Sequence, residues 1–161
     1  QAVSTAVDQA IDALVEYRKV EGLALEKKFR EKIRNISALL ASVEPYEKER
    51  VSKIKERMRA SMLDAVGKNY DENRFEQEMI FYIEKLDINE EKVRLRQHCK
   101  YFLDTIENEP YPGKKLGFIA QEMGREINTT GSKANHTEIQ KLVVKMKDEL
   151  EKIKEQSLNI L

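Results

Sequence analysis

The chain has 161 residues, 36% of them charged and 7% aromatic, with six glycines and three prolines. Its 29 basic and 29 acidic side chains cancel, so no overall positive field indicates nucleic acid, and any such binding needs a local patch. The single cysteine, Cys99, excludes an internal disulfide and is expected to be a small, buried, apolar side chain in a reducing compartment.

No apolar stretch reaches the length needed to cross a membrane, and no secretory signal peptide is visible. The sequence starts at Gln1 rather than at a methionine, so we expect a domain cut from a longer protein.

Apolar residues recur at helical spacing along the chain and never alternate as they would in a strand. In the first half we expect a helix from Val3 to about Val20, with Ile11, Leu14 and Val15 on its inner face. A bend or break at Gly22 precedes an apolar row from residue 25 to about 43. A third helix begins near Pro45 and ends at residues 67–69, and a fourth is capped by Asp71.

In the second half, Asp87 and Glu90 have the spacing of a capping box for a helix that reaches about Ile106. A turn at residues 110–113 leads into the next helix, and a cap signal at residues 135–138 starts a long final helix with a coiled-coil-like row that includes Ile160. The expected fold is all-α, with long antiparallel helices that form hairpins or a bundle. A boundary near Leu86 divides it into a helical hairpin region, 1–86, and a C-terminal helical domain, 87–161.

The segment from Lys115 to Lys133 is the most organised. Its apolar stripe consists of Leu116, Ala120, Met123 and Ile127. Two polar rows lie on its other side, formed by Glu122, Glu126 and Thr129 and by Gln121, Arg125 and Asn128, with Phe118 projecting among them. Residues 129–132 are expected to stop the helix, with Gly131 in a left-handed conformation.

From Leu86 onward the sequence resembles the YicC/YloC family of bacterial proteins. The matching runs are DINEEKVRLRQH (87–98), GKKLGFIAQEMGREINTTGSKAN (113–135) and VVKMKDELEKIKEQSLNI (143–160). Residues 1–86 match more loosely, and we expect the amino-terminal domain of the family to be missing from this chain.

The resemblance implies a cytoplasmic bacterial endoribonuclease that depends on a divalent metal, manganese or magnesium. It also implies RNA as substrate, no membrane association, and a homo-oligomer that is hexameric at full length.

Three side chains are candidates for metal binding and catalysis. Glu122 and Glu126 lie one helical turn apart and can share a hard cation that polarises a phosphoryl oxygen. The alternative is a solvated pair that flanks Arg125. His98 shares a row with Glu91 and Arg94 and can transfer a proton or ligate metal, or it can simply bond a neighbouring carboxylate. His136 is expected at the surface.

Phosphate-binding candidates are Arg94, Arg125, Lys115 and Lys133, with Asn128 as a neutral donor. Each arginine can instead pair with Glu91, Glu122 or Glu126. The run Gly131-Ser132-Lys133 lacks the spacing and the preceding strand of a nucleotide-binding loop, so a nucleoside triphosphatase is excluded.

Two functions remain open at this point. One is a metal-dependent endoribonuclease domain, and the other is a non-catalytic module for RNA binding or oligomer assembly. They differ in one observable feature: a catalytic site leaves its carboxylates open, whereas an interface pairs them.

Overall fold

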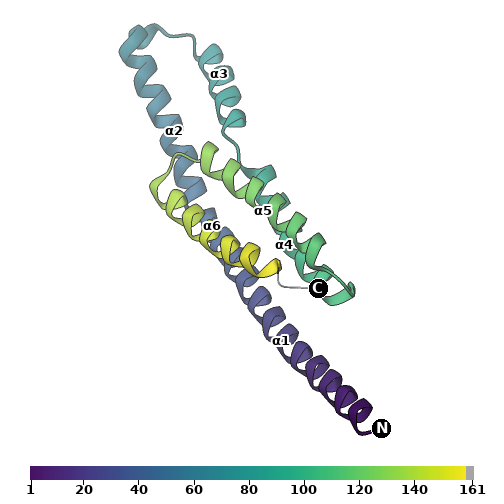
Figure 1. The fold of residues 1–161 in the computed structure, drawn as a ribbon. Coiled ribbons are helices and arrows are strands. Elements are labelled where there is room, and N and C mark those ends of the chain that lie inside the picture. Colours follow the sequence, from purple (N-terminus) through teal and green to yellow (C-terminus); the bar gives the residue numbers. More distant parts are fainter. Residues whose placement is uncertain (159–161) are drawn as a thin grey trace.

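Residues 1–158 are described by the computed structural model, apart from the side chain of Lys68. This part of the chain holds six α-helices, one short 3-10 helix and no strand. The helices are α1 (Ala2–Ala41), α2 (Val43–Val66), α3 (Glu72–Lys85), α4 (Asn89–Asn108), α5 (Gly113–Lys133) and α6 (Thr137–Ser157), with η1 (Gly67–Asn69) after α2. Figure 1 shows long helices lying side by side, which confirms the all-α prediction.

Helices α1 and α2 follow one another almost without interruption, because only Ser42 separates them and its backbone is itself helical. Pro45 lies in the first turn of α2, as predicted. Gly22 does not break α1. Residues 1–24 extend beyond the body of the molecule and are all exposed, so the expected inner face at Ile11, Leu14 and Val15 is wrong (Figure 1).

The hydrophobic core lies where the second half of α1 meets α4, α5 and α6. Buried residues follow a four–three spacing from α1 into the first residue of α2, and again in α6, the pattern with which paired helices pack along a continuous seam. They are Phe29, Ile33, Ile36, Leu40 and Val43 on one side and Ile139, Val143, Met146, Leu150 and Ile153 on the other. Residues from both sides of position 86 therefore share one core, whereas Ile160 lies outside the described residues.

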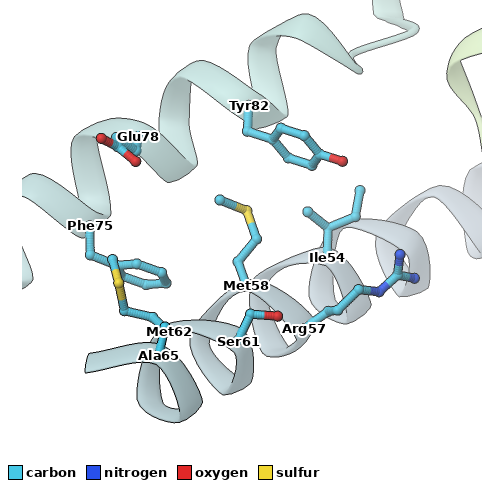
Figure 2. A pocket seen from close by; sticks show the side chains of 9 residues that line it. All are labelled: Ile54, Arg57, Met58, Ser61, Met62, Ala65, Phe75, Glu78 and Tyr82. Atoms are coloured by element: carbon cyan, nitrogen blue, oxygen red, sulfur yellow. The ribbon is translucent and has the colours of Figure 1, made fainter. Parts of the chain in front are cut away.

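Helices α2 and α3 form a hairpin that projects from this body (Figure 1). Gly67 ends α2 with a positive φ of 70°, and the Asp71 carboxylate caps α3 by accepting hydrogen bonds from the backbone N–H groups of Asn73 and Arg74. Both ends were predicted. A mostly apolar pocket of about 340 Å³ lies between the two helices. Figure 2 shows the side chains of Met58 and Phe75 projecting into it.

Two predicted helix starts are displaced by one residue. Helix α4 begins at Asn89 with Ile88 as N-cap, although the Asp87 carboxylate still accepts a hydrogen bond from the Asn89 N–H. Helix α6 is capped by His136, whose Nδ1 accepts from two backbone N–H groups. The His136 side chain is only 9% exposed and its Nε2 lies 3.3 Å from Glu49, so it is not the surface residue we expected.

The predicted stop at Gly131 is also wrong, because α5 continues to Lys133 and Gly131 is helical. Its role is close packing: a Cβ at Gly131 would lie 3.1 Å from Val143 Cγ1, and one at Gly124 would lie 3.3 Å from Leu150 Cδ2. The two glycines are seven residues apart and lie on one face of the helix, so they let α5 approach α6 closely.

Candidate nucleic-acid interface along α4 and α5

The apolar stripe of α5 is buried as predicted, with Leu116, Ala120, Met123 and Ile127 fully inside the core. Phe118 is 60% exposed, in agreement with its expected place among the polar groups. The remaining polar residues are divided between solvent and the contact with α4, which runs antiparallel to α5 (Figure 1). The helix therefore does not present one open polar face.

Glu126 is buried in the contact between the two helices. Its side chain is 6% exposed and its Oε1 lies 3.9 Å from Arg94 Nη1. Glu122 is more open, at 43%, and its Oε1 lies 3.5 Å from Arg125 Nη2. The two carboxylates proposed as metal ligands are thus both paired with arginines.

A divalent metal would need more ligands than this arrangement brings together. Over residues 1–158, no three carboxylate, imidazole or thiol side chains come close enough together to hold a metal ion. A hard cation prefers at least six oxygen ligands, and it competes poorly for a carboxylate that an arginine already neutralises. The described residues therefore do not by themselves fit the predicted metal, and no chemical step is derived through one.

His98 lies on α4 and is half-buried. In the described part of the chain it takes part in no hydrogen bond or ion pair, and neither Glu122 nor Glu126 comes within ion-pair distance of it. Its imidazole is thus not committed to a structural partner.

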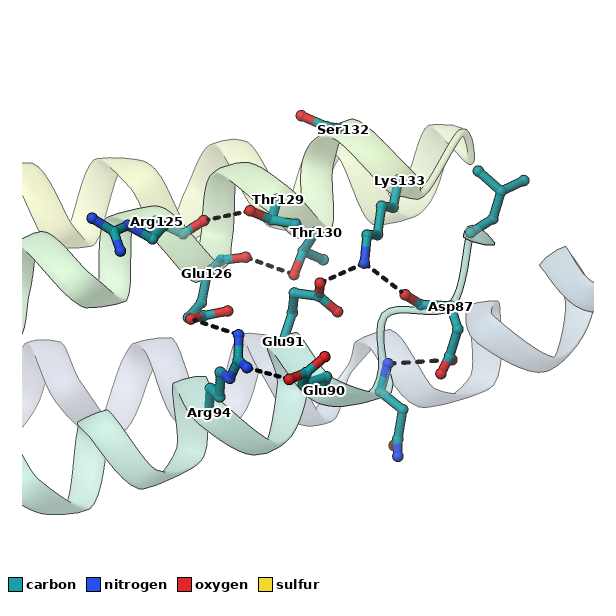
Figure 3. Close-up of polar contacts among 12 residues, drawn as sticks. Asp87, Glu90, Glu91, Arg94, Arg125, Glu126, Thr129, Thr130, Ser132 and Lys133 are labelled. Atoms are coloured by element: carbon teal, nitrogen blue, oxygen red, sulfur yellow. Dashed lines mark hydrogen bonds and ion pairs between the residues drawn. The ribbon is translucent and has the colours of Figure 1, made fainter. Parts of the chain in front are cut away.

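Lys133 and Arg94 each form ion pairs near one end of the α4–α5 contact. Lys133 Nζ donates to Glu91 Oε1 at 2.6 Å and to the Asp87 carbonyl at 3.3 Å. Arg94 donates to Glu90 and faces Glu126. Figure 3 shows both cations reaching across from one helix to a carboxylate of the other.

The other phosphate-binding candidates lie elsewhere. Lys115 is 18 residues from Lys133, about 27 Å along the helix, and its ammonium pairs with Glu109 and lies 5.0 Å from the Tyr101 ring centroid. The hydrogen bond to Glu109 raises the pKa of Lys115. Arg125 and Asn128 are exposed on α5, whereas the hydroxyls of Thr129 and Ser132 donate to carbonyls of their own helix.

Three buried charged residues, Glu91, Lys92 and Arg50, were not singled out from the sequence. Glu91, expected only as a possible pairing partner, is 4% exposed. Arg50 is equally buried and joins three elements, through Glu47 of α2, the Leu86 carbonyl after α3 and the Lys133 carbonyl of α5. The only sequence signal for Arg50 is its i,i+3 spacing from Glu47, which many exposed pairs share.

The fold and this site define an all-helical domain with a charged contact between two antiparallel helices. Residues 43–161 match the family model described as endoribonuclease YicC-like, C-terminal, and the chain belongs to this family.

Two relatives illustrate the match. The chain is 37% identical to a protein named probable endoribonuclease YicC from Clostridioides difficile strain 630, over 98% of this chain and 55% of the relative. It is 30% identical to a protein of the same name from Haemophilus influenzae strain Rd, over 99% of this chain and 55% of that relative. The chain thus spans about half the length of the relatives that it matches.

Within the described residues, no helix is both long enough and apolar enough to cross a membrane.

Proposed function

We propose that this chain is the C-terminal part of a cytoplasmic bacterial endoribonuclease that hydrolyses RNA phosphodiester bonds. The observation that carries the proposal is that Arg94 and Lys133 both lie partly exposed at the same end of the α4–α5 contact, in a chain that belongs to this family. A guanidinium and an ammonium group at the same end of this contact can each bind a phosphate of an RNA backbone, even though the net charge of the chain is zero.

The proposed roles follow from where the side chains lie. Arg94 and Lys133 bind phosphate, and the exposed Arg125 and Asn128 extend this surface along α5. His98, whose imidazole is not committed to a partner, transfers a proton during cleavage. Lys115 would contact a more distant part of the same RNA.

A dependence of the full-length protein on manganese or magnesium is also proposed, although Glu122, Glu126 and His98 do not by themselves form a site for the ion among the described residues. It rests on the resemblance of the sequence to the family, since the carboxylates are paired in this structure. Its test is cleavage of a labelled RNA by the full-length protein with and without a chelator, and cleavage that persists undiminished in chelator would refute it.

The site residues are tested by separating binding from cleavage. His98→Ala should leave RNA affinity nearly unchanged and lower the cleavage rate about 100-fold or more. Arg125→Ala should weaken binding and reduce its dependence on salt. A folded His98→Ala protein that cleaves at the wild-type rate would remove His98 from the site.

One observation favours a second candidate function, a non-catalytic module for RNA binding or assembly. Both carboxylates proposed as metal ligands are paired, the arrangement expected of an interface. The exposed Phe118 and Val93 would then contact another subunit of a homo-oligomer. Light scattering of the full-length protein tests self-association, and loss of binding together with cleavage in the His98 and Arg125 variants would favour this alternative.

A further inference from the structure

Two ion pairs cross the α4–α5 contact in opposite directions. Glu91 of α4 pairs with Lys133 of α5, and Glu126 of α5 pairs with Arg94 of α4 (Figure 3). In each pair the carboxylate is about 95% buried, whereas the cation reaches solvent, with 33% of Lys133 and 52% of Arg94 exposed. The carboxylates of Glu91 and Glu126 thus lie beneath the two cations, and the exposed carboxylate of Glu90 pairs with Arg94 at the surface.

Stability does not explain why Glu91 is buried there. Only its Oε1 has a partner, while Oε2 is buried without any hydrogen bond from the protein. A buried polar atom without a partner lowers stability, and apolar residues often replace a buried ion pair without loss. Such exceptions to good packing occur at functional sites.

The consequence of burying Glu91 is a fixed position for Lys133. The ammonium group has three N–H donors, and Glu91 Oε1 and the Asp87 carbonyl accept two of them. The third remains for a ligand oxygen on the exposed side. An ammonium group held by two acceptors loses less conformational entropy when it binds an anion than a free lysine side chain does.

We propose that Glu91 is a positioning residue, which holds the Lys133 ammonium against a phosphodiester oxygen of RNA beside Arg94. The inference rests on the proposed function and deepens it, since it assigns the two cations to the RNA backbone rather than to a base. Glu91 itself does not touch the RNA, because its free oxygen is buried.

Removal of the Glu91 charge distinguishes two roles for this residue, positioning of the Lys133 ammonium and simple neutralisation of its charge. If Glu91 only neutralised Lys133, Glu91→Gln would make the surface more positive, and the protein would bind and cleave RNA at least as well as wild type. If Glu91 positions Lys133, the same variant keeps or gains RNA affinity but loses about 10-fold to 100-fold in the single-turnover cleavage rate at saturating RNA. Glu107→Gln, at an exposed site near the far end of α4, is the matched control and should cleave normally.

The decisive measurement is a double-mutant cycle in the full-length protein. Because Glu91 acts through Lys133, the Glu91→Gln/Lys133→Gln variant should cleave no more slowly than Lys133→Gln alone. A double variant whose loss of cleavage rate equals the combined losses of the two single variants would overturn the proposal. Cleavage at the wild-type rate by a folded Glu91→Gln protein would also overturn it. If Glu91→Gln does not fold, Glu91→Asp retains the charge but withdraws the carboxylate, and an undiminished cleavage rate would again overturn it.

A second readout does not require cleavage. The Lys133 ammonium should give a nitrogen-15 resonance whose protons exchange slowly in the wild type and fast in Glu91→Gln, and a single-stranded RNA oligomer should shift that resonance. An unchanged exchange rate in Glu91→Gln would refute the positioning role even in an active enzyme. A wild-type protein that does not cleave RNA, yet shows this change, would refute the proposed function and leave the positioning of Lys133 intact.

Discussion

Arg50 is the side chain whose loss should destabilise this fold most clearly. It is 4% exposed, and its guanidinium forms two hydrogen bonds with the Glu47 carboxylate, of 2.7 and 3.2 Å. It also donates to the Leu86 carbonyl at 2.8 Å and to the Lys133 carbonyl at 3.4 Å. Both carbonyls lie at helix C-terminal ends, where no further turn supplies a donor.

The expected cost of Arg50→Ala follows from what it leaves behind. Glu47 is only 14% exposed, so its carboxylate would lose its countercharge in a poorly hydrated position. Removing one partner of a buried ion pair costs about 3–5 kcal/mol of unfolding free energy, and the two carbonyls lose their donor as well. Arg50→Lys should recover only part of this, because an ammonium group cannot reproduce the two parallel hydrogen bonds to Glu47.

Urea unfolding at neutral pH measures the effect. Arg59→Ala is the matched control, since Arg59 is exposed on the same helix and its loss should change the unfolding free energy by less than about 0.5 kcal/mol. Hydrogen exchange should also increase at the start of α4, where the Leu86 carbonyl is held. Equal unfolding midpoints for Arg50→Ala and Arg59→Ala would show that Arg50 does not join the α2–α3 hairpin to the body.

Three further predictions use the same assay or simple titrations. Gly117→Ala should raise the unfolding free energy by about 0.5–1 kcal/mol, since nothing lies within 4 Å of the new methyl group. Gly131→Ala should lower the unfolding free energy, because the new methyl group would lie too close to α6. An equal rise in both variants would refute the packing role of Gly131. Burial raises the pKa of the Cys99 thiol to about 11, so thiol reagents should label it slowly at pH 8 and rapidly only in urea, and fast labelling of the native protein would contradict its burial. Burial raises the pKa of Glu149, but hydrogen bonds from an amide and an ammonium group of α1 together have the larger effect and hold that pKa below 4.5. These contacts therefore stabilise the fold above pH 4.5, and the stabilisation is lost as the pH falls below that value. Glu149→Gln should reduce this acid-induced loss of stability, and an unchanged dependence of unfolding on pH would contradict the prediction.

The sequence was sufficient to predict most of the helices, because their apolar residues repeat at helical spacing. It failed at the C-terminal end of α5, where Gly131 fits a helix stop as well as it fits a close helix contact. Spacing alone does not distinguish these two, since the deciding fact is the position of Val143, twelve residues further along the chain. The exposed start of α1 was misjudged for a related reason: an apolar stripe at Ile11 and Leu14 indicates a face that can be buried, not what buries it.

The candidate site was harder to predict, because burial of charge is decided by tertiary packing. Glu122 and Glu126 are equivalent in the sequence pattern, one turn apart on the same helix. In the fold they differ, since Glu126 turns into the contact with α4 and Glu122 stays near solvent. Glu91 lies at the border of an apolar row, and only the position of Lys133 shows that the protein buries it.

The faces of α5 explain why its polar residues were read as more open than they are. One face supplies the apolar stripe of the core, a second supplies Gly124 and Gly131 to the contact with α6, and a third pairs with α4 through Glu126 and Lys133. The remaining surface carries Phe118 and Arg125, with 60% and 70% exposed. A ligand or partner that contacts this helix meets these two side chains, the exposed Asn128 and the cations that the buried carboxylates hold in place. A change of charge beneath the surface should therefore change the position of those cations and, with it, the cleavage proposed to depend on them.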